Sequence, residues 1–125
     1  MGEKELVKRC QKGDKKAFEE LVERFYPYVS GFLLKTTRNS ILAEDLTQET
    51  FLKMIRNIEK YRPEGASFGT WLISIAKNCY TDHLRKDGIK LEELSEAELF
   101  DGLEDPARQA VEKMTYEEVQ KLLLR

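Results

Sequence analysis

A polar strip without acids runs along the segment SFGTWLISIAKNCYTDHLR, residues 67–85. Apolar residues recur in this segment at helical spacing, so we expect a helix. At about 100° per residue, one strip of that helix gathers hydroxyl groups, an amide and two cations, from Thr70, Ser74, Lys77, Asn78, Thr81 and Arg85. These groups suit phosphate oxygens and the hydrogen-bonding edges of nucleobases. The strip therefore indicates contact with nucleic acid, and Asp82 beside it is placed to orient Arg85 or Asn78.

An ordinary solvated stripe on a helix that is buried on two sides would also explain this pattern. Apolar residues flank the strip on both sides: Phe68, Leu72, Ile75, Cys79 and His83 on one, and Ile73, Tyr80 and Leu84 on the other. Trp71, at the edge, is more typical of a core anchor than of an open platform. The rings near the preceding loop, with Tyr61, Arg62 and Phe68, also suit single-stranded nucleic acid, because each base stacked on a ring contributes about 1–3 kcal/mol.

A second helix with a mixed outer face is predicted over residues 41–61. Its expected core face is Ala43, Leu46, Thr50, Phe51, Met54, Ile55, Ile58 and Tyr61, and the opposite arc is Leu42, Asp45, Gln48, Glu49, Leu52, Lys53 and Arg56. The outer arc has two interpretations. It is either a solvated face with two isolated leucines, or a docking surface on which Leu52 is the apolar anchor and the neighbouring acids meet a basic partner.

All the elements that must position these two faces are predicted to be helices. A short first helix containing Leu6, Val7 and Cys10 should stop at Gly13, and Asp14 should cap a helix over residues 15–36 that Pro27 bends or splits. Asn39 or Ser40 should cap the helix over 41–61, and Ser67 the helix that ends near residues 86–88. The turn-forming residues RPEGAS predict a loop between these last two helices.

The length of 125 residues, with 35% charged and 41% apolar residues, indicates one soluble domain. The longest apolar runs are too short to span a membrane, and the charged N-terminus lacks the apolar region of a secretion signal. Two distant cysteines match no metal spacing and indicate a reducing compartment, which we expect to be the cytoplasm. Charge is uneven: residues 1–90 hold 17 Lys and Arg against 13 Asp and Glu, whereas residues 91–125 hold 4 against 10.

Enzyme chemistry finds little support in this sequence. His83 is the single histidine, and its neighbour Asp82 does not face it, because adjacent residues on a helix point in different directions. The sequence contains no motif for a glycine-rich phosphate loop, a nucleophile elbow or a cluster of metal ligands. We therefore expect a protein that is not an enzyme and takes no cofactor.

Two motifs resemble conserved region two of bacterial sigma factors, in particular the extracytoplasmic-function (ECF) group. One is AEDLTQETF, residues 43–51, and the other is F-x-T-W-L-x-x-I-A-x-N-x-x-x-D-x-x-R, residues 68–85. KGDKKAFEELVERFYPYV, residues 12–29, resembles the start of the same domain, so the resemblance covers residues 3 to about 87. It implies an all-α bundle of about four helices that binds core RNA polymerase through the β′ clamp helices, and that recognises and melts the minus-ten promoter element.

The resemblance also implies roles for individual residues. Asp45, Gln48 and Glu49 match positions that contact the clamp helices. Leu52 is added to this set because it lies on the same outer arc of the predicted helix. The loop from Tyr61 to Ser67, with Arg62, matches the segment that captures a base flipped out of the non-template strand. Lys77, Asn78, Thr81 and Arg85 match the helix that lines this strand, and Phe68 and Trp71 are expected to brace the loop. An anti-sigma factor is a further expected partner.

The expected organisation is a region 2-like helical domain over residues 1–87. Residues 88–125 are expected to be an acidic linker and a short C-terminal helix, the start of a missing or truncated region four. Two rival functions remain. A sigma-like domain that docks on polymerase or an anti-sigma factor without melting DNA would not need Asn78 or Lys77. A generic DNA-binding helical protein would show salt-sensitive duplex binding on its own.

Overall fold

The structure, a computed structural model, describes residues 2–88, and its regular elements are all helical. They are α1 (Glu3–Gln11), α2 (Lys15–Thr37), α3 (Ser40–Asn57), the short 3-10 helix η1 (Ile58–Lys60) and α4 (Phe68–Lys86). The predicted all-α bundle is thereby confirmed. Beyond Gly88, the predicted acidic linker and C-terminal helix of residues 88–125 lie outside the described residues.

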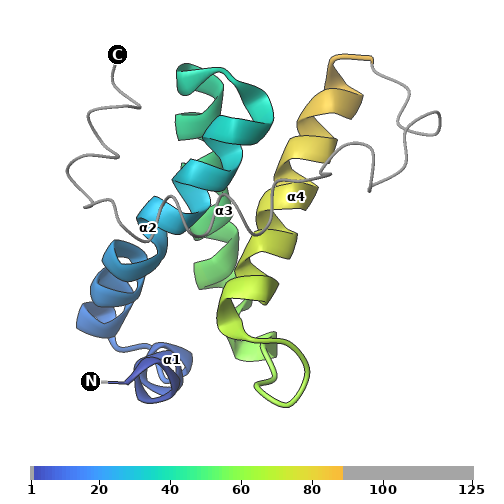
Figure 1. Cartoon of the computed structure of the whole chain (residues 1–125). Helices are drawn as coiled ribbons and strands as arrows, with labels where there is room; N and C mark the ends of the chain where they lie inside the picture. The colour runs from blue at the N-terminus through green and yellow to red at the C-terminus, as the bar shows by residue number, and fades with distance from the viewer. Residues whose placement is uncertain (1, 89–125) are drawn as a thin grey trace.

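Helix α3 is the central element of the bundle. It packs against α2 on one side and α4 on the other, while α1 crosses the end of the bundle and contacts α2 and η1 (Figure 1). The loop that joins η1 to α4 lies at this same end of the molecule. Two faces of neighbouring helices, one on α3 and one on α4, are therefore held in a fixed relation by a shared core.

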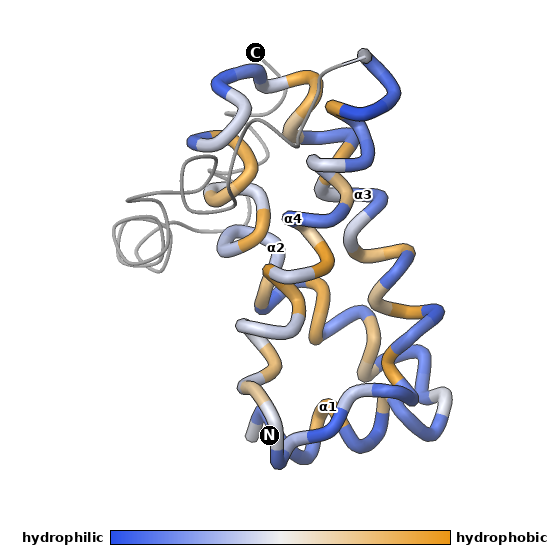
Figure 2. Tube along the Cα trace, turned by 90° about the vertical axis from the view of Figure 1, so that its right-hand side faces the viewer, coloured by the Kyte–Doolittle hydropathy of each residue, from blue (hydrophilic) through white to orange (hydrophobic). Residues whose placement is uncertain are grey.

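The core forms because apolar residues recur at helical spacing on every helix. Hydrophobic and hydrophilic stretches alternate along each one (Figure 2). Among the fully buried side chains are Leu6, Leu21, Val29, Leu33, Met54 and Leu72, which come from all four α-helices. Each such side chain stabilises the fold by about 1.5–3 kcal/mol relative to exposure. No helix within residues 2–88 has the length and apolar character needed to cross a membrane.

Helix boundaries follow the capping residues. The side chains of Asp14, Asn39 and Ser67 accept backbone N–H bonds in the first turns of α2, α3 and α4, at 3.1–3.3 Å. Each satisfies a donor that the helix itself leaves unpaired. Gly13 has φ +89°, a conformation that glycine adopts without strain, and so permits the tight turn between α1 and α2. All these positions agree with the predicted starts.

Pro27 does not split α2. The helix is continuous from Lys15 to Thr37, with Pro27 buried inside it. The predicted alternative of two separate helices is therefore wrong. Burial of Pro27 among core residues offsets the loss of one backbone hydrogen bond, because tertiary packing overrides a local penalty of about 3 kcal/mol.

The predicted core face of α3 needs two corrections. Ile55 was expected in the core, but it is 42% exposed, and buried Thr47 takes a core position instead. The reason is geometric: Ile55 lies about 100° from buried Met54, just outside the arc that α2 and α4 cover. The helix also ends at Asn57 and continues as η1, short of the predicted end at residue 61.

Cys10 gives the fold a predicted dependence on alkaline pH. Burial, helped by the carboxylate of Asp14, raises the pKa of its thiol from the usual 9.0 to about 11. The folded chain therefore keeps this proton at a pH where the unfolded chain loses it. The contribution of this thiol to stability is complete below pH 9 and is lost as the pH rises to about 11. In this window the free energy of unfolding falls by at most about 1.4 kcal/mol per pH unit.

Urea unfolding at a series of pH values from 8 to about 11 measures this effect. Cys10→Ala should make the decline in that window shallower, because it removes one of the two buried thiols, Cys10 and Cys79, whose pKa is raised by burial. A decline of the same slope in both proteins would contradict the assignment to Cys10.

Candidate functional site

Three large exposed hydrophobic side chains lie on one face of α3. Among residues 2–88, Ile41 (70% exposed), Leu52 (54%) and Ile55 (42%) are the large apolar residues on the surface. At about 100° per residue, they share an arc of about 80° with Asp45 and Gln48, both of which are exposed. We call Ile41, Asp45, Gln48, Leu52 and Ile55 the α3 stripe.

The α3 stripe joins residues that the sequence predicted with residues that it missed. Asp45, Gln48 and Leu52 come together as predicted, and half-buried Glu49 lies at the edge. Ile41 and Ile55 were missed, although Ile41 stands 11 positions before Leu52, which is three helical turns and therefore the same face. An apolar row between exposed polar groups is typical of an interface centre, so the stripe is a candidate docking surface.

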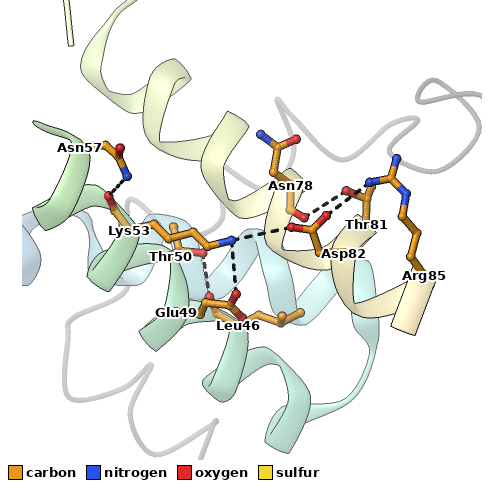
Figure 3. A network of polar contacts seen from close by, with 9 residues as sticks. All are labelled: Leu46, Glu49, Thr50, Lys53, Asn57, Asn78, Thr81, Asp82 and Arg85. Carbon is orange, nitrogen blue, oxygen red and sulfur yellow. Dashed lines mark hydrogen bonds and ion pairs between the residues drawn. The ribbon is translucent and has the colours of Figure 1, made fainter. Parts of the chain in front are cut away.

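The carboxylate of Glu49 is already paired within the chain. Lys53 Nζ lies 3.3 Å from Glu49 Oε1 and 3.8 Å from Asp82 Oδ2 on α4 (Figure 3). Partial burial acts to lower the pKa of Lys53, but the neighbouring Cys79, Glu49 and Asp82 raise it more, so the ammonium stays charged. A cationic partner at the stripe would therefore compete with Lys53 for Glu49.

Asp82 links this pair to Arg85. Its Oδ1 accepts a hydrogen bond from Arg85 Nη1 at 3.3 Å, which confirms one of the two contacts predicted for Asp82. A row of alternating charges thus runs from Glu49 on α3 through Lys53 and Asp82 to Arg85 on α4 (Figure 3). Each pair is partly exposed and contributes about 0–1 kcal/mol, so the row orients side chains more than it stabilises the fold.

The polar residues predicted on one side of α4 form an accessible surface, which we call the α4 strip: Thr70, Ser74, Lys77, Asn78, Thr81 and Arg85. Thr70, Ser74, Asn78 and Arg85 are exposed, and Lys77 and Thr81 are half-buried. The hydroxyls of Ser74 and Thr81 donate to backbone carbonyls within α4, at 2.6 and 3.1 Å, which leaves their oxygens available as acceptors. The amide of Asn78 points away from the Lys53–Asp82 contact (Figure 3). The strip therefore offers an amide, a guanidinium and hydroxyl acceptors on one surface.

The loop between η1 and α4 is organised by Tyr61. Its hydroxyl donates to Ala66 O at 2.8 Å, and its ring packs against Phe68 and Trp71 at centroid distances of 5.6 and 5.2 Å. These contacts fit the predicted bracing role of Phe68 and Trp71. Burial, with the carboxylates of Glu3 and Glu64, raises the pKa of the Tyr61 phenol, which keeps it a neutral donor.

The expectation of base stacking in this region needs correction. Tyr61 is 6% exposed and Phe68 is 2% exposed, so neither presents an open ring face. Residues 62–67 of the loop are all exposed, and Arg62 and Ser67 are the two predicted site residues among them. Arg62 Nη1 donates to the carbonyls of Glu59 and Tyr61, at 2.9 and 3.3 Å, and Ser67 caps α4. The rings of Tyr61 and Phe68 are therefore used for packing, whereas Trp71 is half-buried.

The histidine and the cysteines show no catalytic arrangement. His83 was expected on an apolar side of α4. It is half-buried there, and its Nε2 lies 3.3 Å from Asp87 Oδ2. Burial raises the pKa of both thiols, Cys10 and Cys79, above the usual value, which lowers their reactivity. Within residues 2–88, no three metal-ligating side chains gather at one place.

A family model described as Sigma-70 region 2 matches residues 21–88, more than half of the chain. The chain belongs to the sigma-70 region 2 family. The match contains α3, the loop and α4 entirely, and therefore both candidate surfaces. Helix α1 and the first turns of α2 precede it.

Individual relatives are named as RNA polymerase sigma factors. The RNA polymerase sigma-H factor of Pseudomonas aeruginosa is 31% identical over an alignment of 134 positions. The alignment covers 96% of this chain and 69% of the relative. The ECF RNA polymerase sigma factor BldN of Streptomyces coelicolor is 36% identical, over 80% of this chain and 38% of the relative. The RNA polymerase sigma factor CarQ of Myxococcus xanthus is 47% identical, over 63% of this chain and 45% of the relative.

Several of these sigma-70 region 2 relatives are much longer than the matched segment. The alignments with BldN and CarQ span less than half the length of those relatives. A search of solved structures gave no match.

Proposed function

We propose that this chain is the module of an ECF sigma factor that binds core RNA polymerase and recognises and melts the minus-ten promoter element. The observation that carries the proposal is the pair of surfaces on adjacent helices within the matched region. The α3 stripe is apolar at its centre, and the α4 strip carries cations, hydroxyls and an amide. One surface suits a protein and the other suits a nucleic acid strand.

The α3 stripe supplies the polymerase contact in this proposal. Leu52 inserts into an apolar site on the β′ clamp helices, and Asp45, Gln48 and Glu49 meet polar or basic groups around it. Such an arrangement follows the usual interface pattern of an apolar anchor within a polar rim. Ile41 and Ile55 extend the apolar contact at either end of the stripe.

The α4 strip and the loop supply the strand contact. Opening a duplex costs a few kcal/mol for each unstacked base. Lys77 and Arg85 offset this cost by neutralising phosphates, and Asn78 and Thr81 offer hydrogen bonds to the displaced non-template strand. Arg62 and Ser67 flank the position where the resemblance puts a flipped base. Because residues 1–90 carry an excess of only four positive charges, polymerase supplies most of the affinity.

Strand binding by wild type and Asn78→Ala tests this function. A labelled single strand with candidate minus-ten sequences is titrated with the chain, with and without core polymerase. We expect sequence-selective binding that depends on polymerase and weakens about two- to tenfold in Asn78→Ala, because one hydrogen bond contributes about 0.5–1.5 kcal/mol. Asn57→Ala is the matched control, since that amide bonds Lys53 O on α3, away from the strip.

A complex that forms with polymerase but shows neither strand preference nor an effect of Asn78→Ala would overturn the melting role. It would leave a docking function on the α3 stripe. Salt-sensitive binding of duplex DNA by the chain alone would instead indicate a DNA-binding protein that ignores polymerase.

Two observations favour the docking-only alternative. The rings of Tyr61 and Phe68, on which bases were expected to stack, are buried. Arg85 also already pairs with Asp82. A protein that only docks on polymerase, or on an anti-sigma factor, needs neither an open ring nor an unpaired guanidinium on α4.

The proposal includes the setting in which the chain works. It acts in the cytoplasm, where polymerase and promoter DNA are found, and an anti-sigma factor is its expected inhibitor. The α3 stripe is the surface that such an inhibitor would cover to block polymerase binding.

A further inference from the structure

The side chain of Gln11 ties α1 to the start of the loop. Its Nε2 donates to Ile58 O at 2.9 Å and to Tyr61 O at 3.1 Å. These acceptors lie 47 and 50 positions further along the chain, so the bonds join the first helix to a distant segment of the sequence. Gln11 is half-buried at the last position of α1.

The two acceptors mark the point where the helical backbone of α3 and η1 ends. Carbonyls in the last turn of a helix have no partner within it and need donors from elsewhere. Ile58 O accepts from Tyr61 N at 3.1 Å, and Gln11 adds a second donor. The amide of Gln11 therefore holds the backbone at the site where the chain turns out of the helix into the loop.

Tyr61 carries this constraint across the loop. Its backbone carbonyl is held by Gln11, and its hydroxyl donates to Ala66 O at 2.8 Å, next to the cap of α4. One residue thus connects the first and the last backbone groups of the loop. Arg62 Nη1 donates to Tyr61 O at 3.3 Å, and Ser67 directly follows Ala66, whose carbonyl accepts from the Tyr61 hydroxyl, so the position of Tyr61 sets where both residues stand.

The surroundings agree with a brace at this place. A hollow of about 590 Å³ lies between α1 and the loop, and its lining includes Val7 and Gln11 of α1 and Tyr61 and Pro63 of the loop. Because this space is open, the loop is not fixed by close packing against α1. The two bonds from Gln11 are specific contacts that compensate for it.

We infer that Gln11 is a positioning residue that sets the conformation of the strand-reading loop, residues 61–67. The inference rests on the proposed function, because it assigns to α1 a part in selecting the base. Helix α1 lies outside the residues that the family model matches. Gln11 touches no DNA in this role and acts through Tyr61.

Gln11→Met tests the inference, because methionine keeps the length and removes both donors. Hydrogen exchange of the loop amides is measured on the full chain, and strand selectivity is measured with core polymerase. Selectivity is the ratio of Kd for a strand with an altered base opposite the loop to Kd for the preferred strand. We expect faster loop exchange and a selectivity ratio about three- to tenfold lower, as for the loss of one or two hydrogen bonds.

Asp14→Ala is the control for a general loosening of α1. It removes the cap of α2 in the turn that joins the two helices, without touching the loop. We expect it to lower stability and leave the selectivity ratio unchanged. Gln11→Met should keep its affinity for polymerase, since the α3 stripe is unaltered.

The outcomes separate this inference from the proposed function. If the wild type is selective and Gln11→Met has the same selectivity ratio, only the positioning role is overturned. The same conclusion follows if Asp14→Ala lowers the selectivity ratio as much as Gln11→Met does. A wild-type chain that shows no selectivity would overturn the proposed function, and the positioning role with it.

Discussion

Replacing Leu52 by Asp is expected to lower the affinity for core polymerase at least about a hundredfold. The substitution removes an apolar anchor, which contributes about 1.5–3 kcal/mol when buried, and puts a carboxylate into the same contact. Leu52 is 54% exposed in the chain itself, so the fold does not depend on it. Affinity is measured by titrating labelled chain with core polymerase, and folding by circular dichroism and urea unfolding.

Two comparisons make the Leu52 result specific. Lys16→Gln changes the net charge by the same single unit at an exposed position on α2, and it should leave affinity unchanged. Gln48→Ala, on the same stripe, should weaken binding less than Leu52→Asp, because it removes a polar contact and adds no buried charge. Full affinity in Leu52→Asp, with an intact fold, would remove the α3 stripe from the proposed polymerase contact.

Replacing Phe68 by Ala should cost about 3–5 kcal/mol of folding free energy. The ring is 2% exposed and contacts Phe25, Tyr61 and Trp71 at centroid distances of 5.0, 5.6 and 5.7 Å. Its loss leaves a cavity where α2, the loop and α4 meet. Small domains have a total stability of about 5–15 kcal/mol, so a substantial part of the margin disappears. Urea unfolding of wild type and variant gives the difference.

Phe68→Leu is the matched variant, since it keeps most of the apolar volume. It should cost less than about 1.5 kcal/mol and should retain polymerase binding, because none of the rings that Phe68 contacts belongs to the α3 stripe. A loss under about 1 kcal/mol in Phe68→Ala would mean that the site collapses around the smaller side chain, and that the loop does not rest on this ring.

The helices and their starts were predictable because their signals are local. Asp14, Asn39 and Ser67 cap the helices that follow them, and the spacing of apolar residues places most of the core. Capping depends on a side chain and a backbone donor two or three residues away, so it is encoded within one turn. The end of α3 was less predictable, because η1 continues the helical turn after Asn57 without a distinct sequence signal.

The candidate surfaces were predictable only in part. Helical spacing grouped Asn78, Thr81 and Arg85 on one strip, and Asp45, Gln48 and Leu52 on another, and both groupings hold in the structure. Spacing could not show that Ile55 is exposed, because the width of the buried arc depends on how α2 and α4 pack against α3. For the same reason it grouped Tyr61 with the core face and also offered its ring as a stacking platform, although burial permits only the first.

By itself, the sequence determined the helical periods, the caps and the order of the polar groups along each face, since all of these depend on neighbours within a few residues. Tertiary structure alone decided which groups meet across helices. It brought Lys53 of α3 to Asp82 of α4, and Gln11 of α1 to the carbonyls of Ile58 and Tyr61. Contacts between residues some 30 to 50 positions apart have no local signal, because they exist only once the shared core has fixed the helices relative to one another.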